Sequence, residues 1–146
     1  MDITDPHYIE AYNDDYPTCT RTDAVLRIYG HDLNPSEITQ RLGLTPTSSQ
    51  RRGDPLRHGR KRAPIGGWFL SSDRLVTSLD TRRHLDWLLD RIEPVAHVLA
   101  ELRAEGYRLE IQCWWESAGA TGGPVLNPTH LVRLAALGLP IGFDFN

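Results

Sequence analysis

Apolar and polar residues alternate with a period of two in three segments of the chain, residues 21–30, 107–116 and 140–145. Such alternation is typical of strands with one buried face and one solvated face. In the second segment, Ile111, Cys113 and Trp115 share one face, whereas Trp114 lies on the other. The apolar run at residues 68–70, preceded by two glycines, also suits a strand. We expect the three alternating segments to form one sheet.

Helical patterns separate these strands. In NPSEITQRLGL, Asn34 suits an N-cap, Pro35 the first helical position and Gly43 the end, which predicts a helix over residues 35–42. A longer helix is predicted to begin near Asp80 and end by residue 106, with a kink or break at Pro94. Its apolar positions recur every three or four residues at Leu85, Leu88, Leu89, Ile92, Ala96, Leu99 and Leu102. A third helix is expected in NPTHLVRLAALGLP.

This order of elements predicts a single α+β domain over residues 21–146, with a mainly antiparallel sheet and helices packed on one face. Residues 1–20 form an acidic leader, which we expect to wrap the edge or the other face of the sheet. The similarity of the two Asn-Pro helices has two explanations, shared capping chemistry or two βαβ-like halves. The predicted core includes Leu85, Leu89, Ile92, Leu109, Ile111 and Phe143.

Composition and charge predict the cellular location of the protein and the oxidation state of its cysteines. The 146 residues carry a net charge of −3, no apolar run approaches the length of a membrane span, and the start lacks the basic and apolar regions of a signal peptide. We therefore expect a cytoplasmic protein with no membrane partner. Cys113 is expected to be buried and Cys19 exposed in the polar leader, both as free thiols. We expect no metal and no cofactor, because the histidines are scattered without metal-ligand spacing.

The ordered set of caps, glycines and one tryptophan resembles a bacterial family catalogued as domain of unknown function 4279. The residues that carry the resemblance are Gly30, the run DLNPSEI from Asp32, Leu42-Gly43-Leu44 with Pro46, Gly53-Asp54, Gly67-Trp68 and the closing Leu-Asn-Pro helix. It covers residues 23–145. The resemblance implies this order of elements, and it brings no catalytic residue with it.

Six of the sixteen basic residues fall within twelve positions, between residues 51 and 62. They are Arg51, Arg52, Arg57, Arg60, Lys61 and Arg62, with His58 among them. So much positive charge in an acidic chain favours an acidic protein or a small anion as partner. The alternatives are a solvated loop or a loop docked on the leader carboxylates, such as Asp14 and Asp15. Nucleic acid is disfavoured, because the chain is acidic overall and the loop has no interleaved aromatic residues.

Two tryptophans complete the candidate site. Trp114 is expected to be partly exposed unless a helix or the leader covers its face, and we favour a covering element. A deep pocket that joined Arg51, Arg52 or Arg57 to Trp68 would favour a phosphate- or carboxylate-binding enzyme or sensor. A flat, exposed loop would favour a cytoplasmic interaction module, for example one of the immunity-protein kind. No catalytic residue can be assigned, so we favour the module; its partner and oligomeric state do not follow from the sequence.

Overall fold

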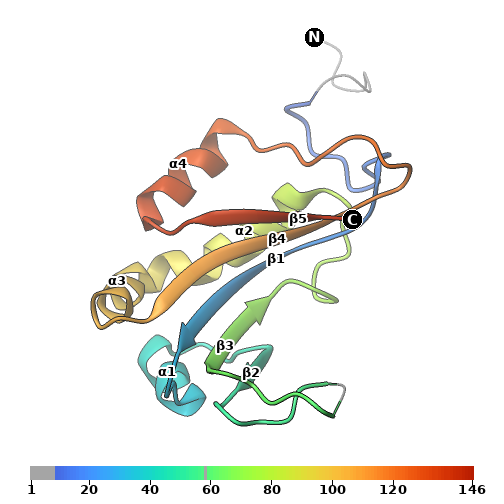
Figure 1. Cartoon of the computed structure of the whole chain (residues 1–146). Coiled ribbons are helices and arrows are strands. Elements are labelled where there is room, and N and C mark those ends of the chain that lie inside the picture. The colour runs from blue at the N-terminus through green and yellow to red at the C-terminus, as the bar shows by residue number, and fades with distance from the viewer. Residues whose placement is uncertain (1–8, 58) are drawn as a thin grey trace.

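The computed structural model describes residues 9–57 and 59–146, in which a five-stranded sheet carries helices on one face (Figure 1). The strands are β1 (Cys19–Gly30), β2 (Ser48–Gln50), β3 (Gly66–Ser71), β4 (Arg108–Ser117) and β5 (Ile141–Phe145). The helices are α1 (Pro35–Leu42), α2 (Thr81–Ile92), α3 (Ala96–Ala104) and α4 (Pro128–Leu137), with a 3₁₀ turn, η1 (Glu93–Val95), between α2 and α3. None of the helices in the described part of the chain is long and apolar enough to cross a membrane.

The strand order is β2-β3-β1-β4-β5, with the long β1 at the centre. Its pairings with β3 and β4 are antiparallel, and so is that of β2 with β3, whereas β4 and β5 are parallel. The parallel pair requires a crossover, which α4 provides. The predicted α+β class, the mainly antiparallel sheet and the helices on one face are confirmed.

Cap residues set the helix ends where the sequence predicts them. The side chain of Asn34 accepts the backbone N–H of Ser36 at the start of α1, and Gly43 ends that helix with a φ of 68°. Gly138 ends α4 with the same φ of 68°, a left-handed conformation that favours glycine. Pro94 lacks the N–H that a continuous helix needs, and the chain forms η1 there instead of one long helix.

The core lies between the sheet and the helices behind it (Figure 1). Leu26 of β1 lies opposite Ile111 of β4, and both are fully buried. Five of the six predicted core residues are buried, and the sixth, Phe143, is half-buried against the same cluster. This packing leaves the other face of the sheet free of helices.

The described part of the leader lies on the helix side of the domain, so the prediction that it wraps the edge or the open face is wrong. Arg82 of α2 is buried, and its guanidinium donates to the backbone carbonyls of Ile9 and Ala11. Backbone carbonyls therefore help to hold the leader, which a count of acidic side chains does not reveal.

The expectation that Cys19 is exposed is also wrong. It begins β1 and is only 4% exposed, because the strand starts earlier than the alternation suggested. Burial raises the pKa of its thiol. Cys113 is fully buried as expected, and both cysteines are free.

Candidate functional site

The basic segment is an ordered hairpin that joins β2 to β3. Backbone hydrogen bonds cross it from Gly53 N–H to Ala63 C=O, from Ala63 N–H to Asp54 C=O and from Leu56 N–H to Lys61 C=O, at 2.8, 2.8 and 2.9 Å. In Figure 1 this green hairpin extends to the lower right, away from the helices. The sequence predicted a loop here, because the stretch is polar and contains several glycines and prolines.

The arginines at the base of the hairpin are bound to neighbouring side chains. Arg51 donates to the Oδ1 atom of Asn34 at 2.9 Å, and Arg52 forms an exposed ion pair with Asp32, also at 2.9 Å. Both acceptors lie next to the start of α1. These two arginines therefore help to fix the hairpin against the domain.

The tip of the hairpin is different. Arg57, Arg60 and Lys61 are exposed, and within residues 9–57 and 59–146 none of them has a hydrogen-bond or ion-pair acceptor. Arg62 is exposed too, with one long contact of 3.5 Å to the carbonyl of Gly53. The tip thus presents a group of uncompensated cations to solvent. His58, which the sequence analysis placed with them, lies outside the described residues.

The two tryptophans of the predicted site are separate from this tip. Trp68 is fully buried, and its Nε1–H donates to the hydroxyl of Thr39 at 3.1 Å, so it belongs to the core. Trp114 is partly exposed on the face of the sheet that bears no helix. The structure brings together the arginines of the predicted site and leaves both tryptophans apart from them.

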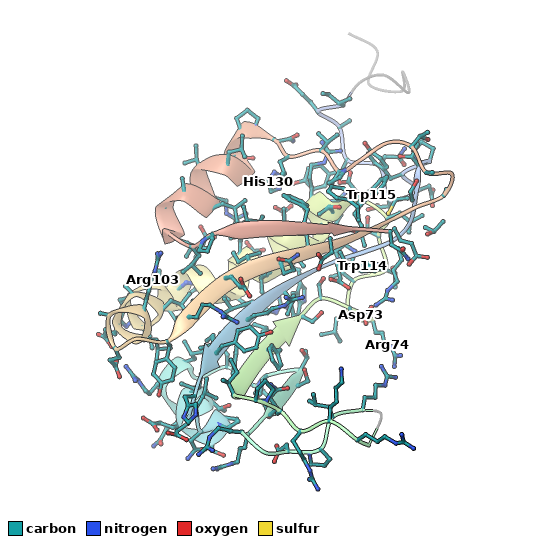
Figure 2. All side chains as sticks on the ribbon, viewed as in Figure 1. Asp73, Arg74, Arg103, Trp114, Trp115 and His130 are labelled. Carbon is teal, nitrogen blue, oxygen red and sulfur yellow. The ribbon has the colours of Figure 1, made fainter. Side chains whose placement is uncertain are left out.

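A groove of about 390 Å³ crosses this open face of the sheet. Its lining residues come from all five strands and from the turn after β3: Arg21, Asp23, Val25, Arg27, Ser48, Phe69, Ser71, Asp73, Gln112, Trp114 and Asp144. Trp114 and Asp73 lie toward the same end of the sheet (Figure 2). No element of the described chain covers Trp114, contrary to the expectation of a covering element. The alternation in β1 could have indicated Asp23 and Arg27, whereas Asp73 and Asp144 join the groove only through the sheet order.

A serine–histidine pair has the hydrogen-bond pattern of a catalytic dyad, but it is buried and a substrate cannot reach it. The hydroxyl of Ser72 lies 2.6 Å from Nδ1 of His84, and Nε2 of His84 lies 2.7 Å from the carbonyl of Ser78. Since a carbonyl only accepts, Nε2 carries the proton and Nδ1 accepts from the serine. Ser72 and His84 are at most 1% exposed, and the serine oxygen also accepts the N–H of Ala24. We assign the pair a structural role, tying β1 to the segment before α2.

A second polar network holds the leader. His130 of α4 is 1% exposed, and its Nε2 lies 2.8 Å from Asp86. The hydroxyl of Tyr12 donates to the other oxygen of Asp86 at 2.7 Å. Burial and this hydrogen bond raise the pKa of Tyr12, so the phenol stays protonated. The network joins the leader, α2 and α4.

In the part of the chain that the structure describes, no group of three or more His, Cys, Asp or Glu side chains is placed to hold a metal ion. What the described residues offer is therefore a charged hairpin tip and an open sheet face.

Fold and surfaces together define a single-domain α+β protein built on an open, mostly antiparallel sheet. The model of the family described as Domain of unknown function (DUF4279) matches residues 18–146, nearly the whole chain, and the protein belongs to this family. Comparisons with curated proteins and with solved structures gave no match.

Proposed function

We propose that this protein is an interaction module that binds an acidic partner through the tip of its basic hairpin. One observation carries the proposal: Arg57, Arg60 and Lys61 project from an ordered hairpin and have no acceptor among the described residues. Because backbone hydrogen bonds already join the two arms of the hairpin, less conformational entropy is lost when a partner docks. Such a surface suits an inhibitor of the immunity-protein kind, which neutralises its target by charge and shape complementarity.

Docking on the chain's own leader is a weaker explanation of this charge. The carboxylate of Asp14 accepts from the hydroxyl of Ser78 at 2.6 Å and from Arg83 at 3.2 Å. These bonds hold the pKa of Asp14 below its ordinary value. This leader carboxylate is thus engaged by Ser78 and by Arg83 of α2 and not by the hairpin.

A small phosphate- or carboxylate-bearing molecule is the alternative ligand. A ligand pocket of that kind was expected to combine the hairpin arginines with Trp68, but Trp68 is fully buried in the core. Exposed cations on a protruding hairpin favour a broad acidic surface over an enclosed anion. The following experiment distinguishes an acidic protein surface from a small anion as the ligand.

The test replaces Arg57, Arg60 and Arg62 together by Ser and measures binding of polyglutamate and of inorganic phosphate at low and at physiological salt. Polyglutamate affinity is expected to fall about tenfold, with a weaker salt dependence, while stability changes little because exposed charges contribute about 0–1 kcal/mol each. A matched control replaces three exposed arginines elsewhere, Arg74, Arg91 and Arg103.

Equal losses in both triple variants would show that only net charge matters, and the hairpin would not be the binding surface. Hairpin-dependent binding of phosphate without binding of polyglutamate would favour the small-molecule alternative. If the wild-type protein binds neither probe at low salt, the hairpin is a solvated surface and the proposal is wrong.

A further inference from the structure

Two neighbouring strands each place an aspartate opposite Trp114. Asp23 of β1 is its direct partner in the antiparallel pairing, and Asp144 of β5 is its partner in the parallel pairing. Directly opposed side chains of an antiparallel pair, such as Asp23 and Trp114, have Cβ atoms about 4.5–5.5 Å apart. The Nε1–H of Trp114 points to a third carboxylate, that of Glu116, at 3.4 Å. Three acidic residues therefore lie next to Trp114, on its own strand and on both neighbouring strands.

Three aspartates line the groove, Asp23, Asp73 and Asp144, against two cations, Arg21 and Arg27. Arg21 lies 3.7 Å from Asp23 and 3.3 Å from Asp73, and its side chain is half exposed. Asp23 is itself 92% buried, being 8% exposed. Burial, together with the charge of Asp73, raises the pKa of Asp23 in spite of Arg21. The carboxylate of Asp144 is exposed and has no hydrogen-bond or ion-pair partner in the described chain.

We propose that the Trp114 end of the groove binds a basic side chain, a Lys ammonium or an Arg guanidinium, of a partner polypeptide. A cation over the face of an indole is attracted by the ring quadrupole, and tryptophan is the best of the aromatic residues for this contact. Asp144 supplies a free carboxylate beside the ring, and the groove volume of about 390 Å³ is enough for a long side chain. An anion would meet the carboxylates beside the ring, which disfavour it at this end of the groove.

This surface is independent of the hairpin tip. The hairpin residues do not line the groove, and the two surfaces have opposite charge preferences. A partner with both signs of charge could use both, yet each site can be removed without touching the other. The hairpin variants above therefore leave the groove intact.

The probe is a short Gly/Lys peptide, and its control is the same peptide with acetylated lysines, which keeps the shape and removes the charge. The ¹H–¹⁵N indole signal of Trp114 is expected to shift on addition of the first peptide, while that of the buried Trp68 stays unchanged. Trp114→Leu is expected to weaken binding about 2- to 30-fold, the loss that corresponds to a cation–π contact. Asp144→Asn, at an exposed position, should weaken it up to about fivefold.

Arg21→Ser tests the proposal through an expected increase in affinity. It removes the competing cation and is expected to tighten binding of the lysine peptide, whereas Asp15→Asn, an exposed carboxylate outside the groove, should leave it unchanged. Equal binding of the acetylated peptide, or unchanged affinity in both Trp114→Leu and Asp144→Asn, would overturn the proposal. Should Trp114→Leu fail to fold, the surface variants at Asp144 and Arg21 still decide it.

Discussion

Replacing Arg82 by Met is expected to destabilise the protein more than any other arginine substitution considered above. The guanidinium is 1% exposed, and all five of its N–H donors are used. It donates twice to Asp80, at 2.9 and 2.7 Å, to the carbonyl of Ala11 at 2.8 Å, to Oδ1 of Asn127 at 2.9 Å, and to the carbonyl of Ile9. Methionine fills much of the same volume and offers none of these donors.

The size of this destabilisation follows from the buried carboxylate that Arg82→Met leaves without its cation. Asp80 is 1% exposed, and without Arg82 its charge is buried with only the backbone N–H groups of Asn13 and of residue 82 as partners. Removing one member of a buried ion pair typically costs about 3–5 kcal/mol. Out of a total stability of about 5–15 kcal/mol, this is a large fraction. For a chain of this size it corresponds to a fall in Tm of roughly 6–20 °C.

Urea unfolding and limited proteolysis of the leader are the assays. The matched control is Arg83→Met, one residue on, whose exposed pair with Asp14 should contribute less than about 1 kcal/mol. The double variant Asp80→Asn/Arg82→Met should be more stable than Arg82→Met, since no charge is then left buried. In Arg82→Met the leader should become sensitive to protease under native conditions. A loss below about 1 kcal/mol with an intact leader would refute this account of the network.

Four further outcomes are expected. Ile111→Ala should cost about 2–5 kcal/mol in urea unfolding, and a loss below about 1 would mean that the faces of β4 are misassigned. Trp68→Phe should cost about 0.5–1.5 kcal/mol more than Trp115→Phe, because only Trp68 loses a hydrogen bond, whereas Nε1 of Trp115 is buried without a partner in the described chain. Both cysteines should resist thiol reagents until urea unfolds the chain, since burial raises the pKa of Cys113 to about 12; rapid native labelling contradicts this. Burial lowers the pKa of His84, so the unfolded chain binds the extra proton first, and stability should fall as pH drops below about 6.5. If stability depends on pH equally in His84→Gln and in the wild type, His84 is not the group responsible.

Local patterns were sufficient for most of the secondary structure. The helix at residues 35–42 has the predicted bounds because its start and its end are both encoded by cap residues. β2 was missed, since Ser48–Gln50 is short and polar, and its strand conformation comes from pairing with β3. The hairpin beyond it was missed for the same reason: its order depends on backbone bonds between its two arms.

The position of the leader could not be predicted from its charge. Acidic residues near one end of the chain and basic residues in one loop suggested that the two would pair. Pairing of exposed charges contributes little, whereas a buried guanidinium must have its donors satisfied, and that requirement decides the contact. Arg82 is one of fifteen arginines, and nothing in the sequence distinguishes it from Arg83 beside it.

For Trp114 and Trp115, the sequence pattern predicts the face of the sheet, whereas the strand order determines the neighbouring residues. Alternation along β4 correctly assigns Trp115 to the core and Trp114 to the opposite face. It cannot say what lies beside Trp114, because that depends on which strands become its neighbours. The antiparallel β1 brings Asp23 to one side, and the parallel β5, delivered by the α4 crossover, brings Asp144 to the other. An antiparallel β5 would place a different residue there, so the charge around the indole is a product of the topology.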